Sequence, residues 1–194
     1  RSHFDSEGEY LTFGAKESLD VLDWVDIVRK IYAPDIPIIL HGVSMGAATV
    51  LIAAGIYDNL VDDNSKPNII CCIADSPYDN IIGQIEYLLG KRSNITKKIV
   101  IGLFKANMRL RAKANASDAS PITSMAYIKL PVMFVHGKDD RYVMPDNSLR
   151  LYEACKSEIK ELLIVEEAGH VCSFVVNPDE YEKVFASFVD RILE

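Results

Sequence analysis

One pentapeptide in the chain has residue types and spacing that could support nucleophilic catalysis. Gly42-Val43-Ser44-Met45-Gly46 follows a short apolar run, Ile38–Leu40, and precedes a stretch rich in alanine. A G-x-S-x-G sequence between a strand and a helix forms a tight turn that lifts the serine hydroxyl above the end of a sheet. We therefore expect Ser44 to be a nucleophile and the Met45 N–H, at the helix start, to donate to an oxyanion.

A serine hydroxyl needs a base to become an effective nucleophile, and the chain has four histidines. His170 lies just beyond the apolar run Glu161–Val165, at the predicted carboxyl edge of a sheet, which makes it the candidate base. The other three suit different roles. We expect His41 to be buried and hydrogen-bonded, His136 to bind nearby backbone, and His3 to lie in the opening loop.

A catalytic triad also needs a carboxylate that orients the histidine, and here it should lie between the serine and the histidine in sequence. Asp139 and Asp140 follow the apolar run Val132–His136, and by position either could orient the histidine. Asp75 ends another run, Ile69–Ala74, and is a weaker candidate that is more typical of a helix cap or turn. The order Ser, Asp, His is that of the α/β-hydrolases and differs from the chymotrypsin and subtilisin orders.

Hydrophobic patterning indicates the elements that must position these residues. Short apolar runs bounded by Pro or Gly predict four buried strands. Helical spacing or composition predicts helices over 16–32, 45–57, 79–113 (two patterns), 145–157 and 178 to about 193, and a loop over 114–124. This alternation predicts one α/β domain over residues 1–194, with a mostly parallel sheet and helices on both faces.

Together these segments resemble the serine esterase/peptidase-like group of bacterial α/β-hydrolases. The stretch His41–Thr49, HGVSMGAAT, is similar to the family's G-x-S-M-G-A-A-T, HGKDDRYVMP resembles its HGxxDxxVP, and Ala168–His170 matches its small-Gly-His. The aspartate four residues after the histidine is that family's triad acid, so the resemblance assigns this role to Asp140. It implies the α/β-hydrolase fold, with a small helical cap over about 79–119.

The resemblance also implies sheet strands that are missing before the first residue. RSHFDSEG is similar to the family's R-x-H-G-x-S-x-G loop, with Phe4 in place of a glycine. The family's second oxyanion donor lies on the missing part, and the loss of one donor can lower the rate by ~10²–10³-fold. We therefore expect an N-terminally short chain whose strand Ile38–Leu40 is an open edge, which another copy or a second chain could cover.

Apolar residues of the expected cap allow two interpretations. Ordinary helix packing is the simpler one, and a wall that binds the acyl or alcohol part of a substrate is the other. The residues concerned are Ile81, Ile82, Ile85, Leu88, Leu89, Ile99, Val100, Leu103, Phe104 and Met108. The basic segment Lys91–Lys113 is interpreted as a solvated helix face.

Composition narrows the possible functions. The formal charge of −7 argues against a nucleic-acid partner, and no apolar run is long enough to span a bilayer. The four cysteines lack metal-ligand spacing, so free thiols in a reducing, cytoplasmic setting are expected, with no metal or organic cofactor. These features predict a serine hydrolase, carboxylesterase-like, acting on a small-molecule ester or acyl substrate through an acyl-enzyme. The alternatives are a peptidase or amidase with the same triad, or a non-catalytic hydrolase-fold binding module.

Overall fold

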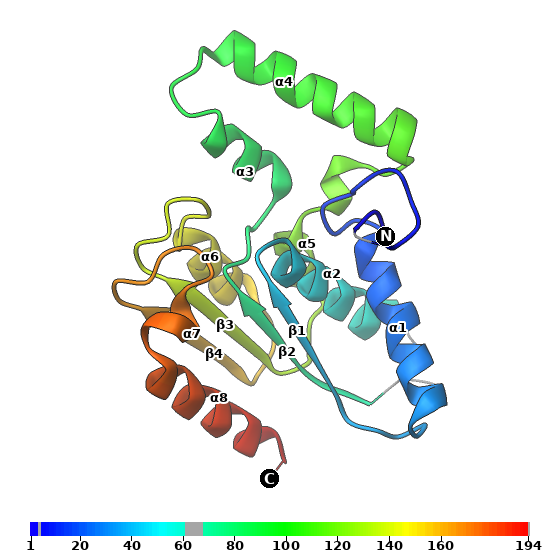
Figure 1. Ribbon diagram of the computed structural model, residues 1–194, viewed down its shortest axis with the longest axis vertical. Helices are drawn as coiled ribbons and strands as arrows, with labels where there is room; N and C mark the ends of the chain where they lie inside the picture. Colours follow the sequence, from blue (N-terminus) through cyan, green and yellow to red (C-terminus); the bar gives the residue numbers. More distant parts are fainter. Residues whose placement is uncertain (4, 61–67, 194) are drawn as a thin grey trace.

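A parallel four-stranded sheet lies at the centre of the protein, with helices on both of its faces (Figure 1). The computed structural model describes residues 1–3, 5–60 and 68–193; Phe4, where the opening loop departs from the family pattern, lies outside this part. The strands are β1 (Ile38–Val43), β2 (Ile69–Asp75), β3 (Val132–Gly137) and β4 (Lys160–Val165), in spatial order β1-β2-β3-β4. Each neighbouring pair is parallel, which confirms the predicted sheet type.

The helices form two layers and a separate segment beyond the carboxyl ends of the strands. One face carries α1 (Glu17–Ile31), α2 (Met45–Leu60), α5 (Pro121–Ser124) and α6 (Asp146–Ala154), and the other carries α7 (Ser173–Val176) and α8 (Pro178–Leu193). The separate segment holds α3 (Ile81–Leu88), α4 (Asn94–Asn107), the π-helical turn η1 (Met108–Ala112) and the 3-10 turn η2 (Ala116–Asp118). Figure 1 shows α4 as the outermost helix. No helix in the described ranges is long and apolar enough to cross a membrane.

Alternate residues of the central strands enter two different cores. On β3, Val132 and Phe134 pack under α1 and α2, whereas Met133 and Val135 pack under α8. The adjacent thiols Cys71 and Cys72 divide in the same way, as predicted, because successive strand residues point to opposite faces. Burial on both faces explains why these strands read as continuous apolar runs.

Three features differ from the sequence predictions. The expected loop 114–124 contains η2 and α5, and α7 was not foreseen, because helices of three or four residues have no periodic signal. His41 was expected to be buried, but it is exposed. Within the described ranges β1 pairs only with β2, and its residues enter only the core under α1 and α2. His41 points to the other face of this edge strand, where it borders a surface pocket that is also lined by Phe174 of α7 and Tyr181 of α8.

A buried carboxylate fixes the start of α1, which packs on the helix that follows Ser44. Glu17 accepts hydrogen bonds from the Thr12 N–H (2.7 Å), the Thr12 hydroxyl (2.5 Å) and the Gly14 N–H (2.9 Å). Burial alone would raise the pKa of Glu17, but the hydrogen bonds from Thr12 and Gly14 hold this pKa below its ordinary value of 4.5. The ionised form is therefore the one that stabilises the fold.

We expect Glu17→Gln to lower the free energy of unfolding at pH 7 by about 1–3 kcal/mol, because an amide nitrogen cannot accept these bonds. The folded pKa lies below the unfolded one, so this contribution is present above about pH 4.5 and is lost as the pH falls further. Urea unfolding of both proteins at pH 7 and at pH 3 measures the effect. The difference in the free energy of unfolding between wild type and Glu17→Gln should be smaller at pH 3 than at pH 7. An equal difference at both pH values would contradict the conclusion that the ionised form of Glu17 stabilises the fold.

Candidate active site

Ser44 lies on a strained turn between β1 and α2. Its φ of 54° is in the left-handed region, which costs a non-glycine residue about 1–3 kcal/mol. The Ser44 N–H donates to the Asp75 carbonyl (2.8 Å), and the Ser44 carbonyl accepts from the Ala48 N–H (3.1 Å). The neighbouring strand and the first turn of α2 therefore hold the strained conformation, with the serine at the carboxyl edge of the sheet.

Two glycines allow chain segments to approach closely around this edge. A Cβ on Gly42 would overlap the carbonyl group of Gly46, so the turn around Ser44 closes only without a side chain there. A Cβ on Gly137 would overlap the carbonyl oxygens of Ala168 and Gly169. Glycine at 137 thus lets the segment after β3 lie against the segment after β4.

Gly42→Ala is expected to destabilise the fold by at least about 2 kcal/mol, because the added methyl group meets backbone atoms that cannot rotate away. The matched control is Gly46→Ala in the same pentapeptide, where an added Cβ has no heavy atom within 4 Å. This control should be neutral or slightly stabilising, since alanine favours helix over glycine. Urea unfolding curves of the two variants give the comparison, and equal losses in both would refute the overlap argument.

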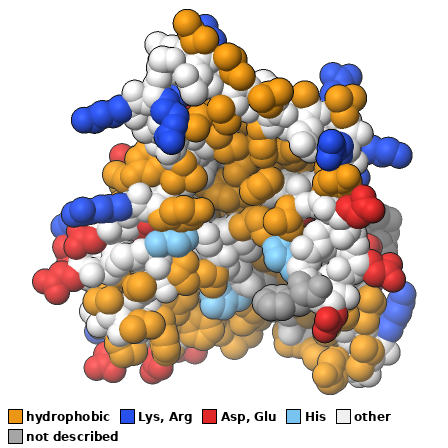
Figure 2. All heavy atoms as spheres, turned by 45° about the horizontal axis from the view of Figure 1, so that its top comes forward, with side chains coloured by type: hydrophobic (Ala, Val, Ile, Leu, Met, Phe, Trp, Pro, Cys, Tyr) orange, Lys and Arg blue, Asp and Glu red, His pale blue; other side chains and the backbone are white. Residues whose placement is uncertain are grey.

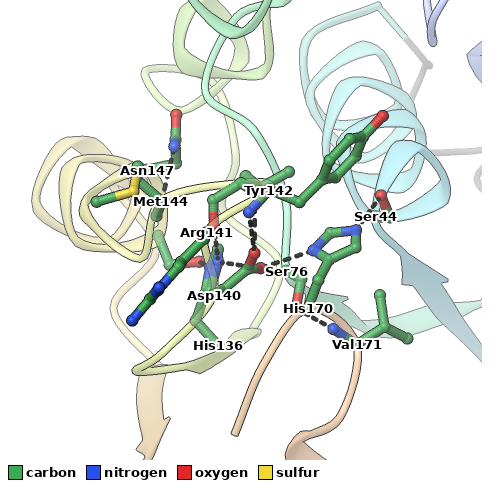
Figure 3. A network of polar contacts seen from close by, with 12 residues as sticks. Ser44, Ser76, His136, Asp140, Arg141, Tyr142, Met144, Asn147, His170 and Val171 are labelled. Atoms are coloured by element: carbon green, nitrogen blue, oxygen red, sulfur yellow. Dashed lines mark hydrogen bonds and ion pairs between the residues drawn. The ribbon is translucent and has the colours of Figure 1, made fainter. Parts of the chain in front are cut away.

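The structure brings three of the predicted site residues into one hydrogen-bonded chain (Figure 3). His170, in the loop between β4 and α7, lies with Nε2 2.9 Å from Ser44 Oγ. Its Nδ1 lies 2.6 Å from Asp140 Oδ2. The His170 side chain is 23% exposed, whereas that of Asp140 is fully buried. The segments that carry these groups each follow a different strand of the sheet.

Asp140 accepts four hydrogen bonds on its two carboxylate oxygens. Oδ1 accepts from the N–H groups of Tyr142 (2.8 Å) and Val143 (2.9 Å), and Oδ2 faces both His170 and His136. Burial alone would raise the pKa of Asp140, but the hydrogen bonds from the two histidines and the two backbone N–H groups hold this pKa well below its ordinary value. The group beside His170 is therefore a carboxylate.

His136 is a second histidine behind this carboxylate, fully buried at the end of β3. Its Nε2 lies 2.9 Å from the Val143 carbonyl and 3.1 Å from Asp140 Oδ2, so Nε2 carries a hydrogen, because a carbonyl oxygen only accepts. Its Nδ1 faces the Ser148 hydroxyl at 2.7 Å. The contact with Val143 confirms the predicted backbone partner. The contact with Asp140 was not predicted. The separation of four residues between His136 and Asp140, across a tight turn, could have indicated that the two side chains meet.

Among the described residues, the other candidates make no hydrogen bond to the His170 ring, which contacts Asp140 and Ser44. Asp139 is exposed, and its N–H donates to the Ala168 carbonyl. Asp75 is buried and accepts from the Ser76 hydroxyl (2.8 Å). Burial raises the pKa of Asp75, which disfavours the charged form that would orient a histidine. His3 is exposed in the opening loop, as expected.

Met45 is the first residue of α2, and the N–H groups of a first helical turn have no acceptor within the helix. The Met45 N–H, next to Ser44 in the chain, is thus available to a ligand at this helix start, whereas the Ala48 N–H already donates to the Ser44 carbonyl. Among the described residues no group of three or more His, Cys, Asp or Glu side chains is placed to hold a metal ion. All four cysteines are free thiols.

Comparisons with known proteins find similarity both in sequence and in fold. Residues 89–174 match the family model of serine aminopeptidase, S33. The chain is 30% identical, over 192 residues or 99% of its length, to the uncharacterized protein YqkD of Bacillus subtilis strain 168, and it spans 60% of that relative. It also resembles the esterase Pf2001 of Pyrococcus furiosus, with a TM-score of 0.65, 25% identity, and 98% of this chain and 68% of that one covered. A monoacylglycerol lipase of Paleococcus ferrophilus shares the fold at 16% identity (TM-score 0.56, 98% and 79% covered).

A parallel sheet with helices on both faces, and a serine on the strained turn after one strand, define an α/β-hydrolase fold. With the likeness in sequence and structure, this chain belongs to the α/β-hydrolase superfamily. Within that superfamily it is similar to esterases and lipases.

Proposed function

We propose that this protein is a serine hydrolase that cleaves carboxylic acyl esters through an acyl-enzyme. The observation that carries the proposal is the continuous path from Asp140 Oδ2 to His170 Nδ1 (2.6 Å) and from His170 Nε2 to Ser44 Oγ (2.9 Å). In it Ser44 is the nucleophile, His170 the general base and acid, and Asp140 the group that orients His170 and stabilises its cation.

In the first half-reaction Ser44 Oγ attacks the ester carbonyl carbon while its proton passes to His170 Nε2. The carbonyl electron pair moves to oxygen, and the Met45 N–H donates to the resulting oxyanion. When this intermediate collapses, the bond to the alkoxy oxygen breaks and His170 returns the proton to the departing alcohol. Water then attacks the acyl-serine in the same way, releasing the carboxylic acid and restoring Ser44.

Apolar side chains near the site support an acyl substrate. Of the residues that allowed two interpretations, Ile81 and Met108 are buried, and Ile82, Ile85 and Phe104 pack against buried clusters. The exposed ones are Leu88, Ile99 and Leu103. Figure 2 shows hydrophobic side chains gathered across the face below the outer helices. Packing therefore accounts for one part of this set, and the other part remains available to the apolar portion of a substrate.

A peptidase or amidase is the second candidate, because residues 89–174 match a serine aminopeptidase family model. The same three side chains would serve, with His170 delivering its proton to a leaving amine rather than an alcohol. The two reactions differ in the leaving group and not in the nucleophile, so a matched pair of substrates separates them.

Labelling with a fluorophosphonate probe, followed by peptide mapping, tests the proposal. We expect the probe on the peptide that contains Ser44, together with faster cleavage of a p-nitrophenyl ester than of the p-nitroanilide with the same acyl group. Faster cleavage of aminoacyl anilides would favour the peptidase. A folded chain that never labels and hydrolyses neither substrate would overturn the enzyme assignment and favour a binding module.

A further inference from the structure

The loop that follows Asp140 is held from outside by α3. The Gln84 side-chain amide donates from Nε2 to the Tyr142 carbonyl at 2.6 Å, and the Tyr87 hydroxyl donates to the Arg141 carbonyl at 2.8 Å. Gln84 and Tyr87 are three residues apart, so both project from one face of the helix. They reach a loop that is 58 and 54 residues further along the chain.

Each of these carbonyls belongs to a peptide group whose N–H binds Asp140. The Arg141 carbonyl and the Tyr142 N–H form one peptide plane, and the Tyr142 carbonyl and the Val143 N–H form the next. Both N–H groups donate to Asp140 Oδ1, at 2.8 and 2.9 Å. In each of these two consecutive peptide planes, the carbonyl accepts a hydrogen bond from α3 and the N–H donates one to Asp140.

The packing around the loop strengthens this connection. Val143 is 1% exposed and lies in one apolar cluster with Ile81 of α3 and Ala48 of α2. The ring centroid of Tyr142 lies 5.0 Å from that of His170. Figure 3 shows the Tyr142 side chain beside His170, on the side toward Ser44. Gln84 is itself buried, so its amide would lose a buried hydrogen bond if the loop moved away.

We propose that Gln84 and Tyr87 are positioning residues that set the direction of the Asp140 carboxylate through these two peptide groups. The proposal rests on the proposed role of Asp140 in hydrolysis. A carbonyl that accepts a hydrogen bond makes the N–H of the same peptide group a stronger donor, because the bonds polarise one another. With Oδ1 held in this way, Oδ2 stays aimed at His170 Nδ1.

The consequence is a defect in the chemical step rather than in substrate binding. Displacing a catalytic group by about 1 Å can lower a rate by about 10²-fold. We expect Gln84→Leu, which removes the buried donor, to lower kcat about 10- to 100-fold, and Tyr87→Phe, which removes one exposed hydroxyl, to lower it about threefold. KM should stay within about twofold in both, because neither side chain touches substrate in this proposal.

The test pairs these kinetics with a measurement that does not depend on turnover. In protein labelled with ¹⁵N at histidine, the hydrogen-bonded Nδ1–H of His170 gives a proton signal that reports its bond to Asp140. Gln84→Leu and Tyr87→Phe should shift this signal, whereas Glu86→Gln, an exposed neighbour on α3, should not. Thermal unfolding of each variant shows whether it is folded, and Tyr87→Phe keeps the ring and its packing.

An unchanged signal in Gln84→Leu and Tyr87→Phe, with unchanged kcat or a change in KM alone, would overturn the positioning role. The positioning role would also be overturned if the His170 Nδ1–H signal shifted by the same amount in Gln84→Leu and Tyr87→Phe as in Glu86→Gln. If the wild type shows no hydrolysis but the signal moves as expected, the proposed function fails and the structural coupling stands. The two ideas can therefore fail separately.

Discussion

Ser44→Ala is expected to abolish fluorophosphonate labelling and to lower kcat for ester hydrolysis on the order of 10⁶-fold. The change removes the hydroxyl that lies 2.9 Å from His170 Nε2, and the methyl group of alanine cannot act as a nucleophile. The fold should remain, since alanine at a φ of 54° carries the same strain as serine does. Probe labelling with peptide mapping and initial rates on a p-nitrophenyl ester measure the effect.

Ser173→Ala is the matched control for this variant. Ser173 is buried three residues after His170, and its hydroxyl has no hydrogen-bond partner among the described residues. Its removal should leave labelling and rate unchanged, and unfolding should become no easier, because no hydrogen bond is lost. Labelling that persists in Ser44→Ala, or disappears in Ser173→Ala, would show that Ser44 is not the nucleophile.

Asp140→Asn is expected to lower kcat about 10⁴-fold. If the amide oxygen of the new side chain accepts from the N–H groups of Tyr142 and Val143, its NH₂ group faces His170. His170 Nδ1 must then accept a hydrogen bond, so the ring hydrogen lies on Nε2. A protonated Nε2 cannot take the proton of Ser44. The opposite amide orientation sets NH₂ against the N–H groups of Tyr142 and Val143, so the variant also loses about 1–3 kcal/mol of folding stability.

The neighbouring Asp139→Asn is the control, because its side chain is exposed. Steady-state kinetics and urea unfolding of both variants decide between the two aspartates. The pKa of Asp140 is held below its ordinary value in the fold, so its contribution to stability is present above about pH 4 and falls in more acid solution. A larger rate loss in Asp139→Asn than in Asp140→Asn would assign the acid to Asp139 instead.

Several outer contacts of the site carried no signal in the sequence. The bonds from Gln84 to the Tyr142 carbonyl and from Tyr87 to the Arg141 carbonyl join residues more than fifty positions apart. Every residue has a backbone carbonyl, so the residue types in a sequence do not show which carbonyl accepts a given hydrogen bond. The position of α3 relative to the loop depends on its packing against Val143 and Ala48. This packing forms only when the sheet has assembled.

The sequence by itself determined the four strands, the main helices and the pentapeptide around Ser44, because hydrophobic spacing and glycine placement act over a few residues. It also indicated that residues after parallel strands meet at one edge, since parallel strands share a direction. Only the tertiary structure decided that Asp140 faces inward and Asp139 outward, that His136 joins the same carboxylate, and that His41 is exposed. The reason is physical: side-chain direction in a tight turn, and burial on an edge strand, depend on which distant segments pack there.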